Sequence, residues 1–184
     1  MPIIGVIASS ISGNLWVANS YESIATSTVA ASETSIIFTS IPNTYKSLQI
    51  RYLAKRNDAL NTSTCSIQFN SDTATNYVIH EVNGNGTAAA ASANTARTAI
   101  GTQYVTGTTP TNIWGVGIID ILDYASTTKN KTVKSFSGGD VNGVGGIVVV
   151  GSGLWLSTSA ITSITLAVGS NWVNGSTFAL YGTK

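Results

Sequence analysis

The sequence predicts an all-β fold, an antiparallel β-sandwich of jelly-roll type with an extended N-terminal arm. Apolar and polar residues alternate in many short runs, which is the period of a strand with one buried face. Turn residues separate these runs into roughly nine to eleven strands, as in sandwiches and jelly rolls. No convincing long helix and no repeat of about 20–50 residues interrupts the pattern. We expect an arm over residues 1–20 and one sandwich domain over residues 21–184.

The first twenty residues are rich in Ile, Val, Leu and Trp but follow neither a helical nor a strand period. Two interpretations stay open, because a chain terminus frays unless something holds it. The segment is either an extra strand of its own domain or an arm docked on a neighbouring subunit. In the second case the candidate partner-binding residues are Ile3, Ile4, Val6, Ile7, Leu15 and Trp16.

The clearest strand of the first half lies at 45–55, where Leu48, Ile50 and Tyr52 alternate with polar residues. Further strands are expected at 22–31, 35–39, 64–70 and 77–82. The tract 87–96, TAAAASANTA, has no large apolar face, and Gly, Thr and Asn flank it. We therefore expect a loop or a short helical turn there.

The second half begins with a strand at 97–105 and continues with 112–122, NIWGVGIIDIL, which is apolar on both faces. Such a strand is either central or covered by another subunit, and Gly115 and Gly117 leave room for a facing chain. Strands at 131–137 and 147–156 follow. The chain is expected to end in a hairpin over 161–181, with its turn at Asn174-Gly175.

Charge is scarce, with 9 Lys and Arg, 8 Asp and Glu, and a formal net charge of +1. Charged residues make up 9% of the chain, against roughly 25% in ordinary soluble domains. A chain of this composition is expected to bury much of its surface against partners. The basic runs, Lys46–Arg51–Lys55–Arg56 and Lys129–Lys131–Lys134, are expected on a solvated strand face and in a solvated loop. Nucleic acid is not an expected partner.

Cys65 is the single cysteine, so no intrachain disulfide can form, and the alternation around it predicts a buried side chain. No stretch approaches the roughly 20 apolar residues that span a bilayer. The apolar start has no basic segment before it and is too short for a typical signal peptide. We expect synthesis in the cytoplasm, no standard secretion and no membrane partner.

No catalytic, cofactor-binding or metal-ligating residues are predicted, and we expect no enzymatic activity. His80 is the only histidine, and its neighbour Glu81 points to the opposite strand face, so His80 is expected to be structural or solvent-facing. Asp120 and Asp123 also lie on opposite faces. We expect Asp120 inside, bonded to a loop backbone, and the Asp123 side chain capping the following turn.

The four tryptophans, together with seven tyrosines, allow a second hypothesis, a sugar-stacking surface, although packing in the core and at interfaces is favoured. Trp172 lies in the last predicted loop among Asn and Ser. It is the tryptophan that we expect to be most exposed. The others are Trp16, Trp114 and Trp155.

Several blocks resemble a family of small structural proteins of tailed-phage virions, common among phages of aquatic bacteria and cyanophage-like. They are MPIIGVIASS, YESIATSTVAASETSIIFTSIPNTYKSLQIR, GIIDILDYASTTKNKTVKS, SGLW, ITSITL and STFALYG, and the similarity covers residues 1–182. The resemblance implies a jelly-roll-like β-sandwich in the phage particle, a homotrimer, and no cofactor. It supplies no catalytic residues.

Two positions in such a virion compete. A head decoration (cement) protein would bind the major capsid protein and copies of itself on the head surface. A tail-fibre or receptor-binding module would instead present loops to host surface glycans. The short chain and the apolar arm favour the cement role, while a cellular lectin-like domain is a weaker third hypothesis.

Overall fold

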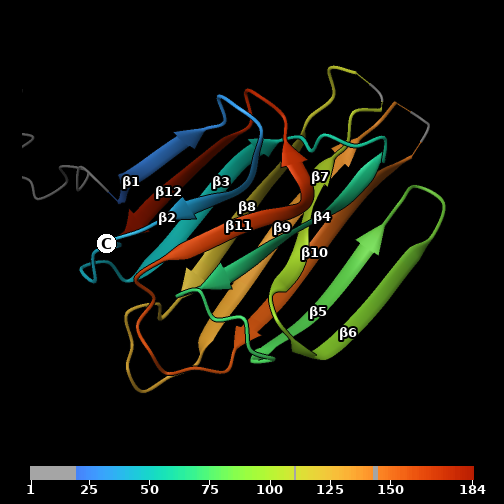
Figure 1. The fold of residues 1–184 in the computed structure, drawn as a ribbon. Helices are drawn as coiled ribbons and strands as arrows, with labels where there is room; N and C mark the ends of the chain where they lie inside the picture. Colours follow the sequence, from blue (N-terminus) through green and yellow to red (C-terminus); the bar gives the residue numbers. More distant parts are fainter. Residues whose placement is uncertain (1–19, 110, 143–144) are drawn as a thin grey trace, which may run out of the picture.

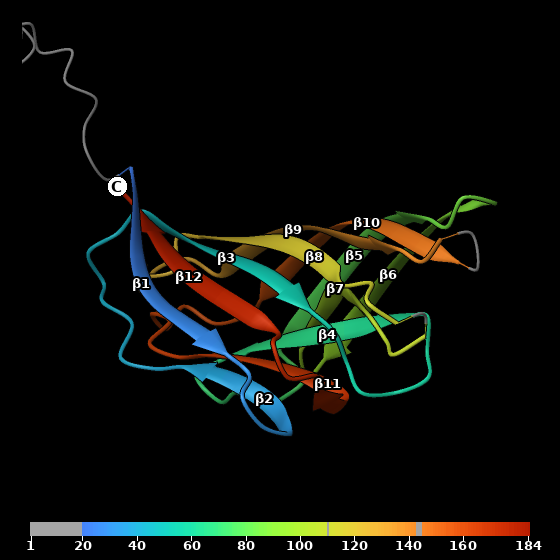
Figure 2. The ribbon, with the colours of Figure 1, turned by 90° about the horizontal axis from the view of Figure 1, so that it is seen from above.

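A computed structural model describes residues 20–109, 111–142 and 145–184 of the chain. These residues form twelve strands and no helix, arranged in two antiparallel sheets that pack face to face (Figures 1 and 2). The predicted antiparallel sandwich is therefore confirmed. The six candidate partner-binding residues of the arm lie outside the described residues, so Ile3, Ile4, Val6, Ile7, Leu15 and Trp16 stay a prediction.

The larger sheet has eight strands, and the smaller has four. In spatial order the large sheet comprises β1 (Tyr21–Thr28), β12 (Thr177–Thr183), β3 (Ser47–Ala54), β8 (Gly115–Leu122), β9 (Lys131–Asp140), β10 (Gly146–Trp155), β5 (Tyr77–Gly84) and β6 (Ala89–Arg97). The small sheet comprises β2 (Glu33–Phe38), β11 (Ile164–Trp172), β4 (Thr62–Phe69) and β7 (Ile100–Thr106). Strands β1 and β6 are thus the opposite edges of the large sheet.

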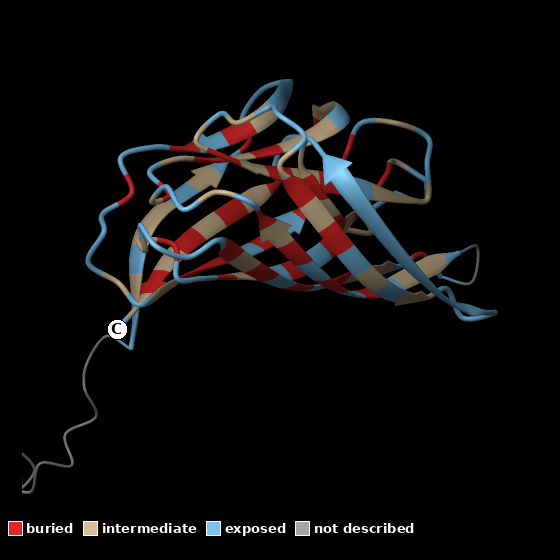
Figure 3. Cartoon of the chain, turned by 90° about the horizontal axis from the view of Figure 1, so that it is seen from below, coloured by how far each residue is buried: buried red, intermediate tan, exposed pale blue. Residues whose placement is uncertain are grey.

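The core lies between the two sheets and follows the alternation expected from the sequence. In β3, Leu48 and Ile50 are fully buried, and Ile119 lies opposite Ile50 on the neighbouring strand β8. Leu166 of β11 is fully buried in the same core on the side of the small sheet. Figure 3 shows the same alternation of buried and exposed positions along the central strands. Cys65 is fully buried as predicted, and burial raises the pKa of its thiol to about 12.

The expected C-terminal hairpin is wrong, because its two strands lie in different sheets. β11 pairs with β2 and β4, whereas β12 pairs with β1 and β3. The connection between them is held by Val29, which donates to the Ser176 carbonyl and accepts from the Gly175 amide at 2.8 and 2.9 Å. The alternation of apolar and polar residues predicts only that each strand has one buried face. An arch, in which the chain crosses from one sheet to the other, meets this condition as well as a hairpin within one sheet does.

The tract predicted as a loop or helical turn is mostly strand β6. The turn before it contains Gly86 with a φ of 85°, and the Asn85 side chain accepts hydrogen bonds from the amides of Thr87 and Ala88. This turn returns the chain antiparallel to β5. Backbone pairing with β5, rather than burial of side chains, therefore holds β6 as a strand. For that reason the composition of the tract did not indicate a strand.

Asp72 anchors the connection between β4 and β5. Its carboxylate accepts hydrogen bonds from the Trp155 indole at 2.8 Å, the Ala74 amide at 2.9 Å and the Asn76 side chain at 3.0 Å. The bonds from Asn76, Trp155 and Ala74 hold the pKa of Asp72 below its ordinary value of 3.8. The stabilisation is therefore present above about pH 4 and is lost as the pH falls through the lower folded-state pKa.

We expect Asp72→Ala to lower the free energy of unfolding by about 1–3 kcal/mol at pH 7, because it leaves the buried Trp155 N–H unpaired. Urea denaturation at pH 7 and at pH 3 measures the effect. The difference from the parent protein should shrink at the lower pH. Asp72→Asn keeps one acceptor oxygen and should lose less. Equal stability of Asp72→Ala and the parent at pH 7 would contradict this role.

Candidate binding surface

The face of the large sheet that points away from the small sheet carries an apolar patch. Its six members are large apolar side chains with exposed fractions between 40% and 59%, from β5, β8, β9 and β10. We call them the apolar face: Val82, Val116, Ile118, Phe136, Val148 and Val150. They alternate along their strands with residues that point into the core.

The register of the strands brings these side chains together. Ile118 lies opposite Phe136, Phe136 opposite Val150, and Val150 opposite Val82, so one row crosses four strands. Directly opposed residues in an antiparallel pair have neighbouring side chains. The apolar face is therefore continuous, although its residues are spread over almost seventy positions of the chain.

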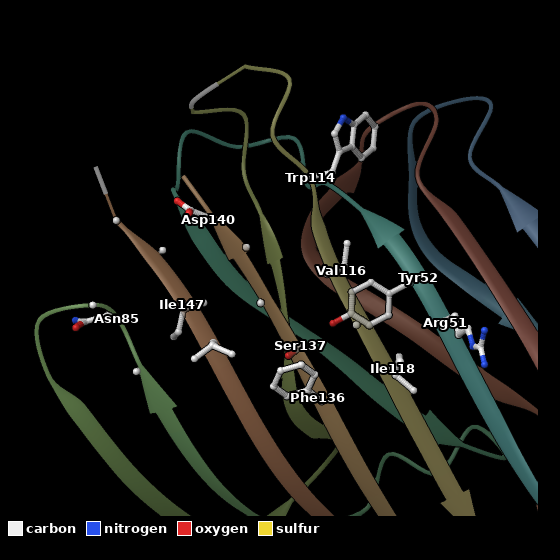
Figure 4. Close-up of a pocket in the computed structure, with 18 of the residues that line it drawn as sticks. Arg51, Tyr52, Asn85, Trp114, Val116, Ile118, Phe136, Ser137, Asp140 and Ile147 are labelled. Atoms are coloured by element: carbon white, nitrogen blue, oxygen red, sulfur yellow. The ribbon is translucent and has the colours of Figure 1, made fainter. Parts of the chain in front are cut away.

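A second row contains glycines in place of large side chains, and the surface is hollow there. Gly138 lies between Val116 and Val148, and Gly84 follows Val148 on the next strand. The resulting hollow has a volume of about 1030 Å³ (Figure 4). Apolar side chains form much of its wall, with Trp114 at one side, and its polar side chains include Arg51, Asn85 and Asp140.

The polar residues beside the apolar face are bonded to one another. The Gln49 side chain donates to Asp120 and accepts from Arg51, both at 2.7 Å. The Arg51 guanidinium also lies 5.3 Å and 5.4 Å from the rings of Tyr21 and Tyr181. These contacts form a polar border to the apolar face, in which the Asp120 carboxylate is hydrogen-bonded.

The two aspartates singled out in the sequence do not form a pair. Asp120 is not inside but on the outer face, because Ile119 and Ile121 on either side of it take the core positions. The Asp123 side chain does not cap the turn: it pairs with Lys129 at 3.2 Å, while its backbone carbonyl accepts from Ser126. Strand β8 ends at Leu122, so Asp120 lies within the strand and Asp123 in the connection that follows it.

A second hollow, of about 710 Å³, adjoins the apolar face beside β6. Its walls include Val82, Val150, Ala91 and Ala93, with His80 and Lys134. His80 is exposed, as predicted. Both hollows therefore open on the same face of the large sheet.

Of the seven residues in the basic runs, Lys46, Arg51, Lys129 and Lys134 are exposed, as predicted, but Lys55, Arg56 and Lys131 are buried. Lys55 and Arg56 are 5% and 8% exposed, and Arg56 pairs with Asp58 and donates to Ser63. Lys131 is fully buried in β9, where its ammonium donates to the Lys129 carbonyl at 2.6 Å and burial lowers its pKa. Long basic side chains near the ends of strands can cover apolar surface with their methylene groups, while their charged ends reach hydrogen-bond partners.

The prediction that Trp172 is the most exposed tryptophan is wrong. Trp172 is 1% exposed and Trp155 2%, and both lie in the core. Trp114 is partly buried and lies beside the larger hollow (Figure 4). Of the tryptophans in the described ranges, Trp114 is thus the one available for contact with a ligand.

Within the described residues, no group of three or more His, Cys, Asp or Glu is placed to hold a metal ion. Nor do these residues include a helix with the length and apolar character needed to cross a membrane. Comparisons of the chain with protein-family models, curated proteins and solved structures found no match.

Proposed function

We propose that this protein is a phage virion structural protein, a head decoration protein that binds between shell subunits through the apolar face. The observation that supports this is the continuous row from Ile118 to Val82, exposed on the outer face of the large sheet. Soluble monomers rarely expose contiguous apolar patches beyond a few hundred Å². A patch of this kind is typical of a surface that another protein covers.

Energetics also favour a protein partner over a small molecule. Burial of apolar surface contributes roughly 25 cal/mol per Å², and a standard protein interface covers about 800 Å² on each partner. Six side chains that are about half exposed, with the glycine hollow between them, offer a broad area of this type. The scarcity of charge, 9% of residues, fits the same interpretation.

In this proposal the partners are the major capsid protein and further copies of this chain, arranged as a homotrimer on the head surface, with no cofactor. A protein that binds only the assembled shell stabilises it by mass action. Threefold repetition of one contact adds avidity without a single tight site. The protein therefore acts by clamping neighbouring shell subunits.

The alternative role, a receptor-binding module for host glycans, is favoured by one observation. Trp114 lies beside a hollow that also presents Asn85 and Asp140. An aromatic ring next to hydrogen-bonding side chains can stack on a sugar and orient its hydroxyls. The wall also contains Val116, Ile118 and Phe136 of the apolar face, which fit a protein partner better than a glycan.

Phe136→Asp tests the proposal, because it places a charge at the centre of the apolar face. We expect binding to shells that lack this protein, measured by co-sedimentation, to weaken at least tenfold. The matched control is Ile37→Asp, since Ile37 is 58% exposed but lies on β2 of the small sheet. That variant should bind as the parent does.

Unchanged binding of Phe136→Asp would contradict a role of this face. If Trp114→Ala instead abolishes binding to host glycans while shell binding is absent in the parent, the glycan-binding role replaces the cement role. Cryo-electron microscopy of the particle gives the independent check, with density expected on the head between shell subunits.

A further inference from the structure

Strand β6 ends the large sheet with an open edge. It pairs with β5 on one side, and in the described parts of the chain no strand pairs with its other side. All nine of its residues are exposed (Figure 3). Edge strands are usually protected by Lys, Pro, bulges or a covering element. Here residues 89–94 are small or uncharged, and the register shift is confined to the far end, opposite Tyr77–Ile79.

The direction of the backbone groups follows from the turn. The Asn85 amide donates to the Ala88 carbonyl at 3.2 Å, which makes these two residues a hydrogen-bonded pair. Pairs alternate along an antiparallel ladder, so Ala89, Ala91 and Ala93 belong to the non-hydrogen-bonded type. Their N–H and C=O groups therefore point to the open edge. A strand that adds to this edge bonds to every second residue of the edge strand, and the outward-pointing groups of β6 have this spacing.

The surface beside this edge has room for large side chains. Ala91 lies opposite Val82, and Ala93 lies opposite His80, at the second hollow of about 710 Å³. Because alanine is short, side chains of a strand added outside β6 can lie over Ala91 and Ala93, at the border of the hollow whose walls also include Val82. The edge thus combines backbone groups that confer affinity with an apolar recess that selects Ile or Val.

Residues 1–19 supply a segment of this chemistry. They carry no Lys, Arg, Asp or Glu side chain, and residues 3–8 read IIGVIA. The chain enters the described structure at Ser20, next to β1, which is the edge opposite β6. With neighbouring strands about 4.8 Å apart, the two edges of an eight-stranded sheet lie roughly 34 Å apart.

We infer that residues 3–8 of a neighbouring copy pair with the open edge of β6. The segment that is donated precedes β1, and the strand that accepts it is β6, at the opposite edge of the same sheet. The contact is therefore heterologous and repeats from one copy to the next. It closes as a ring where the rotation between copies allows. A ring of three would be the homotrimer of the proposed function. The inference deepens that function by naming a second copy as the occupant, but its test needs no shell.

The test measures the mass of the full chain by sedimentation equilibrium. The double variant Ala91→Pro/Ala93→Pro removes two N–H groups that point outward and keeps the hydrogen bonds to β5. We expect self-association to weaken at least tenfold. The matched control, Ala91→Ser/Ala93→Ser, keeps both N–H groups and should associate as the parent does.

A second measurement avoids the risk that proline disrupts the hairpin. In the full chain the amides of Ala91 and Ala93 should be protected from hydrogen exchange, and deletion of residues 1–19 should remove that protection. A peptide of residues 1–10, added to the deleted protein, should restore it.

Three results would overturn the inference: a parent protein that stays monomeric, oligomers unaffected by both the proline and the deletion variants, or protection of β6 within a monomer. The last would place the arm on its own sheet. None of them depends on Phe136, so failure here is distinguishable from failure of shell binding.

Discussion

Trp172→Ala is expected to lower the free energy of unfolding by about 3–5 kcal/mol, the usual cost of removing a fully buried large aromatic side chain. The indole of Trp172 packs edge-on against Phe178, with ring centroids 4.8 Å apart. Trp172 ends β11 of the small sheet and Phe178 lies in β12 of the large sheet. The variant therefore opens a cavity between the two sheets. Urea denaturation followed by circular dichroism measures the loss.

Trp114→Ala is the matched control, since the same side chain is removed from a partly exposed position beside the larger hollow. It should cost no more than about 1 kcal/mol. Trp172→Phe is informative as well, because the indole N–H of Trp172 has no hydrogen-bond partner among the described residues. Phenylalanine keeps most of the packing and removes this unpaired donor, so it should cost much less than alanine. Equal losses for Trp172→Ala and Trp114→Ala would contradict the burial of Trp172.

The burial of Trp172 could be predicted only in part from the sequence. Ile164, Leu166, Val168, Ser170 and Trp172 share one parity, but Val168 and Ser170 are only partly buried. The register with β2 shifts between Ala167 and Trp172, so the alternation of the first half of β11 does not continue unbroken to the indole. The nearby Asn and Ser residues favour a loop, and for this reason the sequence predicted an exposed Trp172.

Other features depend on contacts between distant parts of the chain and could not be predicted. The period of 2 located β3 and β8 well: buried residues alternate with exposed or half-buried ones throughout β8, and in β3 the alternation is broken only at the buried Gln49. It does not say which strands become neighbours. The arch between β11 and β12, and strand β6, depend on backbone pairing with partners that the sequence does not identify.

The candidate binding surface was predictable only in part. The sequence around Ile118 is apolar on both faces, which correctly indicated a central strand with a second apolar side. The row that joins Ile118, Phe136, Val150 and Val82 exists only because of the register between four strands. A shift of one residue in any strand would turn its members to the other face. Register, more than composition, creates this surface.

The close packing of the two sheets leads to the last prediction. The sequence suggested that Gly115 and Gly117 leave room for a facing chain, and this is confirmed at Gly115, whereas Gly117 leaves room for the ring of Tyr52 on the adjacent strand β3. A side chain at Gly115 would begin 2.6 Å from the Val105 Cα and 2.8 Å from the Thr106 amide nitrogen. Both atoms belong to the backbone of β7, which cannot turn aside as a side chain can. Gly115→Val is therefore expected to lower the free energy of unfolding by about 3 kcal/mol or more.

Valine has a higher strand propensity than glycine, so propensity alone predicts that Gly115→Val raises the free energy of unfolding. A lower value would therefore show that the steric contact with β7 outweighs strand propensity. Gly101→Val is the matched control: Gly101 also lies in a strand, β7, but a Cβ there meets nothing within 4 Å. It should leave the stability unchanged or raise it slightly. Thermal or urea unfolding of the two variants compares them directly. If both behave alike, the sheets do not meet at Gly115. If only Gly115→Val is destabilised, the contact between β7 and β8 sets the spacing of the sandwich beneath the apolar face.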